Sequence, residues 1–198
     1  MTVPRRHART ARSLLARLAL AAALLLGLGP WQTGWANDLT RFVGTYVGQA
    51  TVDDLATGER QQRDLDIVVV PYREQGLRID WITVGLVDGR RDLPGVKRWS
   101  QTALFQPADD RDFLVEVGAV DLFSERRETE PIEGDPVRWT SVDGNVLQTN
   151  SFIVLEDGRY ELQVYQRILT ETGMDIRFER IVDGETVRRV TGSTARAG

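Results

Sequence analysis

The sequence predicts an all-β protein, an antiparallel meander of about eight to ten strands that closes into a barrel. Apolar and polar residues alternate with a period of two in segment after segment, and Gly, Pro and Asp separate these segments. In the C-terminal third, Asp-Gly pairs join successive segments, which is typical of tight hairpins between strands that pair in chain order. A meander closes more directly into an up-and-down barrel than into a Greek-key sandwich, whose connections cross over.

The N-terminal residues 1–36 have the layout of a secretory signal peptide. Five arginines and no acid precede an apolar run of 12 residues, Leu18–Gly29, and Gly34–Ala36 ends in small residues at its first and third positions. A spanning helix needs about 20 apolar residues, so we expect cleavage before Asn37 rather than a retained membrane anchor. Residues 37–198 then form a single barrel domain that is periplasmic or secreted.

Alternation and turn residues predict where each strand begins and ends. Asp157-Gly158 and Asp183-Gly184 mark two-residue hairpins, because both residue types tolerate the positive φ that such turns need. The longest polar break, Ser124–Pro136, is expected to be a surface loop or a short helix. The predicted strands are Arg41–Val52, Arg63–Val70, Leu77–Val84, Lys97–Phe105, Phe113–Val120, Val137–Ser141, Val146–Leu155, Arg159–Leu169, Met174–Val182 and Glu185–Gly192.

Alternation also predicts which side chains point inward. Four apolar faces are expected to line the barrel, and the residues between them are mostly charged, which is typical of antiparallel strands with one wet face. The predicted inward sets are Leu65, Ile67 and Val69; Leu77, Ile79 and Trp81; Tyr160, Leu162 and Val164; and Met174, Ile176 and Phe178.

Composition excludes several function classes for residues 37–198. They carry 20 Lys and Arg against 29 Asp and Glu, a net charge of about −9, which argues against nucleic acid and anionic lipid as partners. They contain no His and no Cys. Ser-His-Asp triads, Cys nucleophiles and ordinary zinc, copper and haem sites are therefore excluded. We expect no catalysis, no cofactor and no metal.

The start of the first strand resembles a known superfamily. Phe42-x-Gly44-x-Tyr46 is similar to the F-x-G-x-W opening of calycins, which include lipocalins and fatty-acid-binding proteins. The resemblance implies a calycin-like barrel with one end closed by these residues. It also implies that the aromatic packs against a basic residue of the last strand, here Arg188 or Arg189. Residues 37–198 also resemble a secreted proteobacterial family that brings no function with it.

A small barrel of this kind holds one ligand or is filled by its own side chains. Six aromatic residues are candidates for lining a cavity, or alternatively for filling a dry core: Trp81, Trp99, Phe105, Phe113, Phe152 and Phe178. Gln101 and Gln166 are also expected to face inward. Arg180 shares a face with Phe178 and, if buried, needs a ligand carboxylate or an internal acid as its partner. The alternative is that Arg180 reaches solvent at the strand end.

Three functions follow from this description. The first is a barrel without catalysis that binds or carries a small apolar or amphipathic molecule. The second is a structural or protein-interaction module with a filled barrel. An open cavity would support the first function, and a packed interior would support the second. An outer-membrane barrel is a minor third alternative, because strands of nine to eleven alternating residues are its signature.

Overall fold

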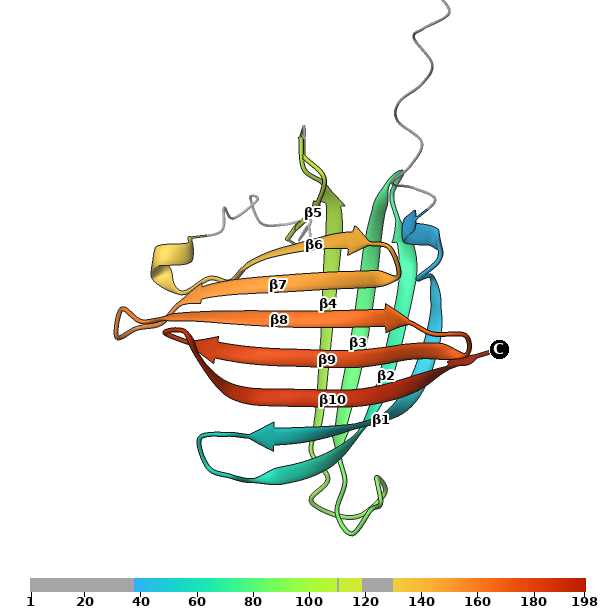
Figure 1. The fold of residues 1–198 in the computed structure, drawn as a ribbon, viewed down its shortest axis with the longest axis vertical. Coiled ribbons are helices and arrows are strands. Elements are labelled where there is room, and N and C mark those ends of the chain that lie inside the picture. The colour runs from blue at the N-terminus through green and yellow to red at the C-terminus, as the bar shows by residue number, and fades with distance from the viewer. Residues whose placement is uncertain (1–37, 110, 119–129) are drawn as a thin grey trace, which may run out of the picture. The chain divides into compact units, whose positions relative to one another are not determined.

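The computed structural model describes residues 38–109, 111–118 and 130–198, and within them it shows ten strands (Figure 1). The predicted signal peptide, residues 119–120 of the fifth predicted strand and residues 124–129 of the predicted polar break lie outside the described residues. The elements are β1 (Gly44–Asp54), β2 (Arg60–Tyr72), β3 (Gly76–Gly85), β4 (Arg98–Pro107), β5 (Leu114–Glu116), the 3-10 helix η1 (Pro131–Glu133), β6 (Val137–Asp143), β7 (Val146–Val154), β8 (Tyr160–Leu169), β9 (Gly173–Val182) and β10 (Glu185–Ala197).

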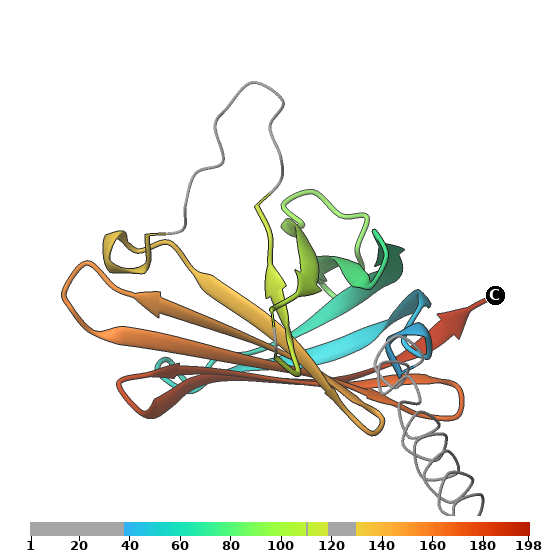
Figure 2. The same ribbon diagram turned by 90° about the horizontal axis from the view of Figure 1, so that it is seen from above.

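The strands form one closed antiparallel barrel in chain order, as the sequence predicts. Each strand pairs with its neighbours in the chain, and β1 also pairs with β10 to close the sheet. In Figure 1 the strands β7–β10 run across the view in front of β2–β4. Figure 2 shows the same barrel from above, with β2–β5 in green on one side and β6–β10 in yellow to red on the other. The closure is least complete at the short strand β5, which pairs with three residues of β4 and two of β6.

The predicted strand ends shift where local geometry overrides alternation. The first strand begins at Gly44 rather than Arg41, because residues 38–42 form a helical turn with a hydrogen bond of 3.1 Å from the Phe42 amide to the Leu39 carbonyl. The last strand continues past Gly192 to Ala197. Asp183 and Gly184 both have positive φ, at 49° and 84°, so the hairpin predicted there is confirmed.

The end of the barrel where β1 begins and β10 finishes is closed by its own side chains, and we call it the closed end. Phe42 and Tyr46 are fully buried there. The Tyr46 hydroxyl donates to the Phe42 carbonyl at 3.0 Å and accepts from Arg196 Nη2 at 2.6 Å. The same Nη2 donates to the Arg41 carbonyl at 2.9 Å. Arg196 therefore ties the lead-in segment to the last strand.

This arrangement confirms the expected plug and corrects its partner. Tyr46 packs against a basic residue of the last strand, but that residue is Arg196, not Arg188 or Arg189. The register explains the difference, because Tyr46 lies directly opposite Arg196, whereas Arg188 lies opposite Asp54 at the other end of β1. Directly opposite residues in an antiparallel pair are the ones whose side chains meet.

The glycines of β1 allow close packing around this plug. A Cβ added to Gly44 would lie 3.3 Å from the ring of Tyr46 and 3.4 Å from Arg196 Nε. A Cβ at Gly48 would lie 2.1 Å from the Ser193 carbonyl oxygen of the paired strand β10. The contact at Gly48 is far too short for a Cβ, and the contacts at Gly44 are tight, so a larger residue at either position requires its neighbours to shift.

Three of the four predicted inward faces are confirmed, and the face predicted for β8 is wrong. Tyr160, Leu162 and Val164 point outward. Tyr165 lies directly opposite Phe178 of β9, and because opposite residues share a face, Tyr165 points inward with Phe178. Pairing with its neighbours therefore fixes the orientation of β8 against its own hydrophobicity, and places polar residues in the barrel interior.

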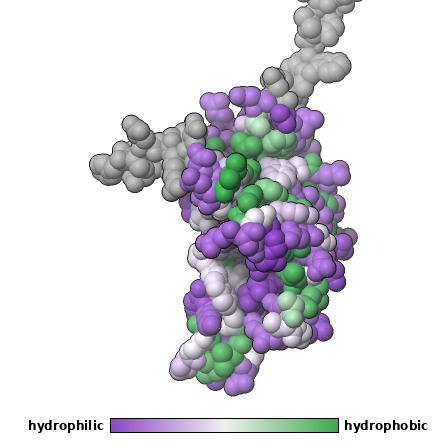
Figure 3. Space-filling view, turned by 90° about the vertical axis from the view of Figure 1, so that its left-hand side faces the viewer, coloured by the Kyte–Doolittle hydropathy of each residue, from purple (hydrophilic) through white to green (hydrophobic). Residues whose placement is uncertain are grey.

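The outer surface is largely hydrophilic on the side that Figure 3 shows. Figure 3 shows one side of the molecule, where purple residues dominate and green patches lie between them. Asp80, on the outer face of β3, accepts from Thr102 at 2.6 Å and from Arg78 at 3.1 Å. Charged pairs at such positions are unlike the apolar band that a transmembrane barrel presents to lipid. None of the helical segments in the described residues has the length and apolar character needed to cross a membrane.

Candidate functional site

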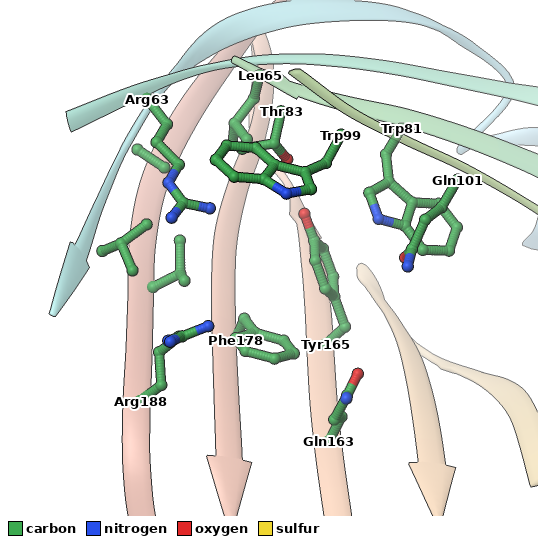
Figure 4. A pocket seen from close by; sticks show the side chains of 13 residues that line it. Arg63, Leu65, Trp81, Thr83, Trp99, Gln101, Gln163, Tyr165, Phe178 and Arg188 are labelled. Atoms are coloured by element: carbon green, nitrogen blue, oxygen red, sulfur yellow. The ribbon is translucent and has the colours of Figure 1, made fainter. Parts of the chain in front are cut away.

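A cavity of about 460 Å³ lies in the half of the barrel away from the plug, which we call the open end (Figure 4). The hairpins β1–β2, β3–β4 and β9–β10 bound this end of the barrel. The volume is within the range of about 300–1,000 Å³ that is usual for small-molecule sites. The cavity is lined by Ala50, Val52, Arg63, Leu65, Trp81, Thr83, Trp99, Gln101, Gln163, Tyr165, Phe178, Arg188 and Val190.

Aromatic rings form much of the cavity wall. The ring of Tyr165 lies 6.4 Å from that of Trp81 and 5.7 Å from that of Phe178, with tilts of 44° and 57°. These separations are those of favourable aromatic pairs. Trp99 lines the cavity from β4, and in Figure 4 the Tyr165 phenol points toward it. Rings on several sides offer flat apolar surfaces to a ligand.

The charged residues that line the cavity are two arginines, Arg63 and Arg188, and both side chains project into it in Figure 4. The Arg63 guanidinium lies over the Trp99 ring, 4.5 Å from its centroid. Arg188 Nη2 donates to an Asp54 carboxylate oxygen at 2.7 Å. The Nε atoms of both arginines are buried and have no hydrogen-bond partner among the described residues. The cavity of this acidic protein therefore carries local positive charge.

The two arginines affect each other and their neighbours electrostatically. Burial, and then the positive charge of Arg188, lower the pKa of Arg63. The hydrogen bond from Arg188 is the largest cause that lowers the pKa of Asp54. Arg63 has no carboxylate within 4.0 Å among the described residues, so it is a cation without an acidic partner beside another cation. An anionic group in the cavity would relieve this repulsion.

Arg180 reaches an internal acid, which was one of the two partners considered from the sequence. Its Nε donates to Glu161 Oε2 at 2.7 Å; Glu161 is almost fully buried, whereas 37% of the Arg180 side chain is exposed. Burial acts to raise the pKa of Glu161, but the hydrogen bonds from Arg180 and Gln163 outweigh burial, so the pKa is lowered overall. Arg180 is thus neutralised at the open end and does not line the cavity.

The structure brings some of the predicted lining residues together and places others elsewhere. Trp81, Trp99 and Phe178 line the cavity. Phe105 is inside the barrel but fully buried in the packed core, and Phe113 precedes β5 beside Arg111. Phe152 faces outward and stacks on Tyr160, with centroids 6.1 Å apart, because it belongs to the outer face that β7 shares with β8. The predicted glutamines also divide: Gln101 lines the cavity, whereas Gln166 lies outside the barrel and donates to Gln148 at 2.9 Å.

Sequence reasoning missed three functional side chains, Arg63, Tyr165 and Arg188. Arg63 has the same parity as Leu65 and Ile67, so the alternation of β2 already placed it inward, but its charge made it look like a strand end. Tyr165 was assigned outward with the rest of its face. For Arg188 the register shift between Thr186 and Arg188 is a feature of pairing with no sequence signal.

No group of three or more His, Cys, Asp or Glu residues is placed to hold a metal ion in the part of the chain that the structure describes. The polar groups at the cavity include arginine and glutamine donors, which suit an anion or a polar organic group.

Comparison with known proteins supports the fold. No protein-family model matches the chain, and no curated protein matches it. A solved structure of an S-type phycobiliprotein lyase from Guillardia theta is similar, with a TM-score of 0.53 and 10% identity over 84% of this chain and 94% of that chain. The likeness, together with the closed ten-stranded meander, supports a calycin-like barrel. The resemblance to a secreted proteobacterial family stays a prediction.

This neighbour corrects the expectation that the chain is not an enzyme. The absence of His and Cys excludes His- and Cys-based catalysis in residues 37–198, but a protein with a similar barrel is a lyase by its description. The exclusion of catalysis in general was therefore wrong. At 10% identity the likeness establishes the fold and does not assign an activity.

Proposed function

We propose that the open end of the barrel binds one small amphipathic molecule with a flat apolar body and an anionic group. The observation that carries the proposal is the cavity of about 460 Å³, lined by four aromatic side chains and by two arginines with no lining acid. The rings suit the apolar body, because aromatic faces pack favourably on planar groups. The unpartnered Nε atoms of Arg63 and Arg188 suit the anion.

The shape of the interior favours this proposal over a filled structural module. Side chains fill the closed end, with Tyr46, Phe105 and Met174 all fully buried, yet a ligand-sized space remains at the open end. A barrel that served only as a rigid module would gain stability from filling that space. Keeping aromatic and cationic groups around an open cavity is instead typical of a binding site.

The test uses N-phenyl-1-naphthylamine, a neutral aromatic probe whose fluorescence rises in apolar sites. Thr83→Trp places a large side chain in the cavity. Ile82→Trp is the control, because Ile82 is the adjacent residue of β3 and its side chain lies on the exposed outer face of the barrel. We expect saturable binding of one probe per chain for the natural sequence and for Ile82→Trp, and a loss of binding for Thr83→Trp. Equal binding by both variants, or none by the natural protein, would contradict the proposal.

We further propose that the chain acts outside the cytoplasm. Support comes from the basic and apolar segments that precede Asn37, which have the order of a signal peptide. Cell fractionation followed by N-terminal sequencing of the recovered protein tests this: an exported protein beginning at or near Asn37 is the expected result. A cytoplasmic protein that retains residues 1–36 would refute it.

A further inference from the structure

Arg167 of β8 is the most deeply buried charge in the described residues, with 1% of its surface exposed. Its guanidinium lies close to two rings, 4.1 Å from the centroid of Tyr165 and 5.6 Å from that of Trp81. Nη1 donates to Thr149 Oγ1 at 3.2 Å. No carboxylate lies within 4.0 Å in the described ranges, so Arg167 differs from Arg138, Arg180 and Arg188, which all have an acid.

A second, smaller cavity of about 30 Å³ lies beside Arg167. It shares Trp81, Tyr165 and Phe178 with the main cavity, so the two spaces adjoin. Two residues that line it, Arg167 and Ser151, each have a buried atom without a hydrogen-bond partner, Nε and Oγ. Two residues with an unpartnered buried polar atom thus line one space, which is large enough for a small polar group of about the size of a water molecule.

The energetics of this arrangement favour an anion beside Arg167. A buried charge without a counter-charge is unfavourable by several kcal/mol, about as much as the desolvation of one ion. Two aromatic faces return about 0.5–2 kcal/mol. The Thr149 hydroxyl satisfies one of the five N–H groups of the guanidinium. Burial lowers the pKa of Arg167, but the ordinary pKa of arginine is so high that the group stays charged at neutral pH.

We propose that this small cavity is a carboxylate subsite, in which Arg167 Nε and Ser151 Oγ bind one carboxylate of the molecule whose body lies in the main cavity. The inference rests on the proposed function and adds to it a position for the anionic group at the inner end of the ligand. A compact inorganic anion has the same chemistry and could bind there too. Because the small cavity adjoins the aromatic cavity, a carboxylate attached to an apolar body also gains the binding energy of that body. We therefore assign the site to a ligand carboxylate.

The experiment compares 2-naphthoate with 2-naphthamide, which is similar in shape but has no charge, in competition with N-phenyl-1-naphthylamine. The variants are Arg167→Met, which keeps an unbranched apolar side chain, and Arg177→Met, which removes the same charge from the exposed outer face of β9. We expect the natural protein and Arg177→Met to prefer the carboxylate by about 10- to 100-fold, the worth of a charged hydrogen bond. Arg63 and Arg188 keep their charge at the main cavity, so Arg167→Met is expected to lose most, and not all, of this preference and still bind the neutral probe.

Thermal unfolding separates this role from a structural one. Without ligand, Arg167→Met is expected to have an equal or higher Tm, because it replaces an uncompensated buried charge with an apolar side chain. A large fall in Tm would mean that Arg167 mainly supports the core and would overturn the proposal. An unchanged preference for naphthoate in Arg167→Met would also overturn it.

Two further outcomes show whether the carboxylate subsite or the proposed function is wrong. If sodium chloride or sodium acetate raises the Tm of the natural protein as much as naphthoate, and does not do so for Arg167→Met, the site takes free anions and the assignment to a ligand carboxylate is wrong. If the neutral probe does not bind but acetate stabilises the natural protein through Arg167, the proposed function fails and the anion site stands.

Discussion

At the closed end of the barrel the interior polar groups are paired within the protein, whereas at the open end several are not. Tyr46 is bonded to both Phe42 and Arg196, and Thr194 donates to the Met174 carbonyl at 3.1 Å. Around the main cavity at the open end and the small cavity that adjoins it, Arg63, Arg188, Ser151 and Arg167 all have buried atoms without a hydrogen-bond partner among the described residues. Native proteins pair nearly all buried polar groups, so unmet donors gathered around a cavity are expected where a ligand completes the site.

The sheet therefore contributes to stability at one end of the barrel and to the candidate binding site at the other. The same strand β3 supplies Leu77 and Ile79 to the packed core and Trp81 and Thr83 to the cavity. Substitutions at the closed end are therefore expected to change the free energy of unfolding, and substitutions at the open end to change binding with little change in stability.

Phe42→Ala is the strongest test of this division. Phe42 is fully buried in the plug, and removing such a ring costs about 3–5 kcal/mol of the free energy of unfolding. Trp99→Ala, at the open end where 43% of the residue is exposed, is expected to cost about 1 kcal/mol or less, the worth of its contact with Arg63. Urea denaturation measures both, and similar losses in the two variants would contradict the comparison.

Gly173→Ala and Gly85→Ala form a matched pair on backbone packing. A Cβ at Gly173 would lie 1.8 Å from the Thr194 carbonyl oxygen, whereas at Gly85 the nearest atoms are 3.7 Å away. We expect a loss of about 1–3 kcal/mol for Gly173→Ala, the usual cost of overpacking. Gly85→Ala is expected to stay within about 0.5 kcal/mol of the natural protein. The Tm of each variant measures the loss. An equal fall in Tm for Gly173→Ala and Gly85→Ala would contradict the expected difference between the two ends of the barrel.

Tyr46→Phe tests the hydroxyl that joins the lead-in segment to β10. Its removal leaves the buried Phe42 carbonyl without that donor, and we expect a loss of about 1–3 kcal/mol, the cost of a buried unsatisfied group. Tyr165→Phe is the control in the cavity, since its hydroxyl has no hydrogen bond in the part of the chain that the structure describes. Chemical denaturation should show almost no change for Tyr165→Phe, and an equally stable Tyr46→Phe would weaken the role given to the plug.

The smallest expected effect is the pH dependence that Glu161 contributes. Its pKa is lower in the folded protein than the ordinary value of 4.5. The carboxylate therefore stabilises the folded state above about pH 4.5, and this contribution is lost as the pH falls through the lowered pKa. Glu161→Gln should flatten the fall of the unfolding free energy between about pH 5 and pH 3 relative to the natural protein. Parallel curves for the two proteins would exclude this contribution.

Much of the closed end could be predicted from local sequence. The partner of Tyr46 was predicted wrongly, because it depends on how β1 pairs with β10. Phe42-x-Gly44-x-Tyr46 identified the plug because all three residues lie within one turn and one strand. Arg196 was missed because Thr194–Ala197 has no strand-like alternation. Those residues are held in the sheet by pairing with β1, for example Ala197 opposite Thr45, which only the closed barrel supplies.

The surroundings of the two cavities could be predicted only in part, because several of the residues that point inward there are not apolar. Trp81 and Phe178 follow the rule that inward residues are apolar and were placed correctly. Arg167 and Tyr165 do not, since β8 turns its more polar face inward to match the register of β9. Hydrophobic alternation cannot report a polar interior, and a functional cavity is where such a departure is expected.

Native mass spectrometry of the protein purified from its native organism tests the central claim most directly. We expect a species heavier than the polypeptide by one small molecule, which is released on unfolding and is absent from Thr83→Trp but present in Ile82→Trp. A mass equal to that of the polypeptide alone, together with no binding of N-phenyl-1-naphthylamine by the same preparation, would contradict it.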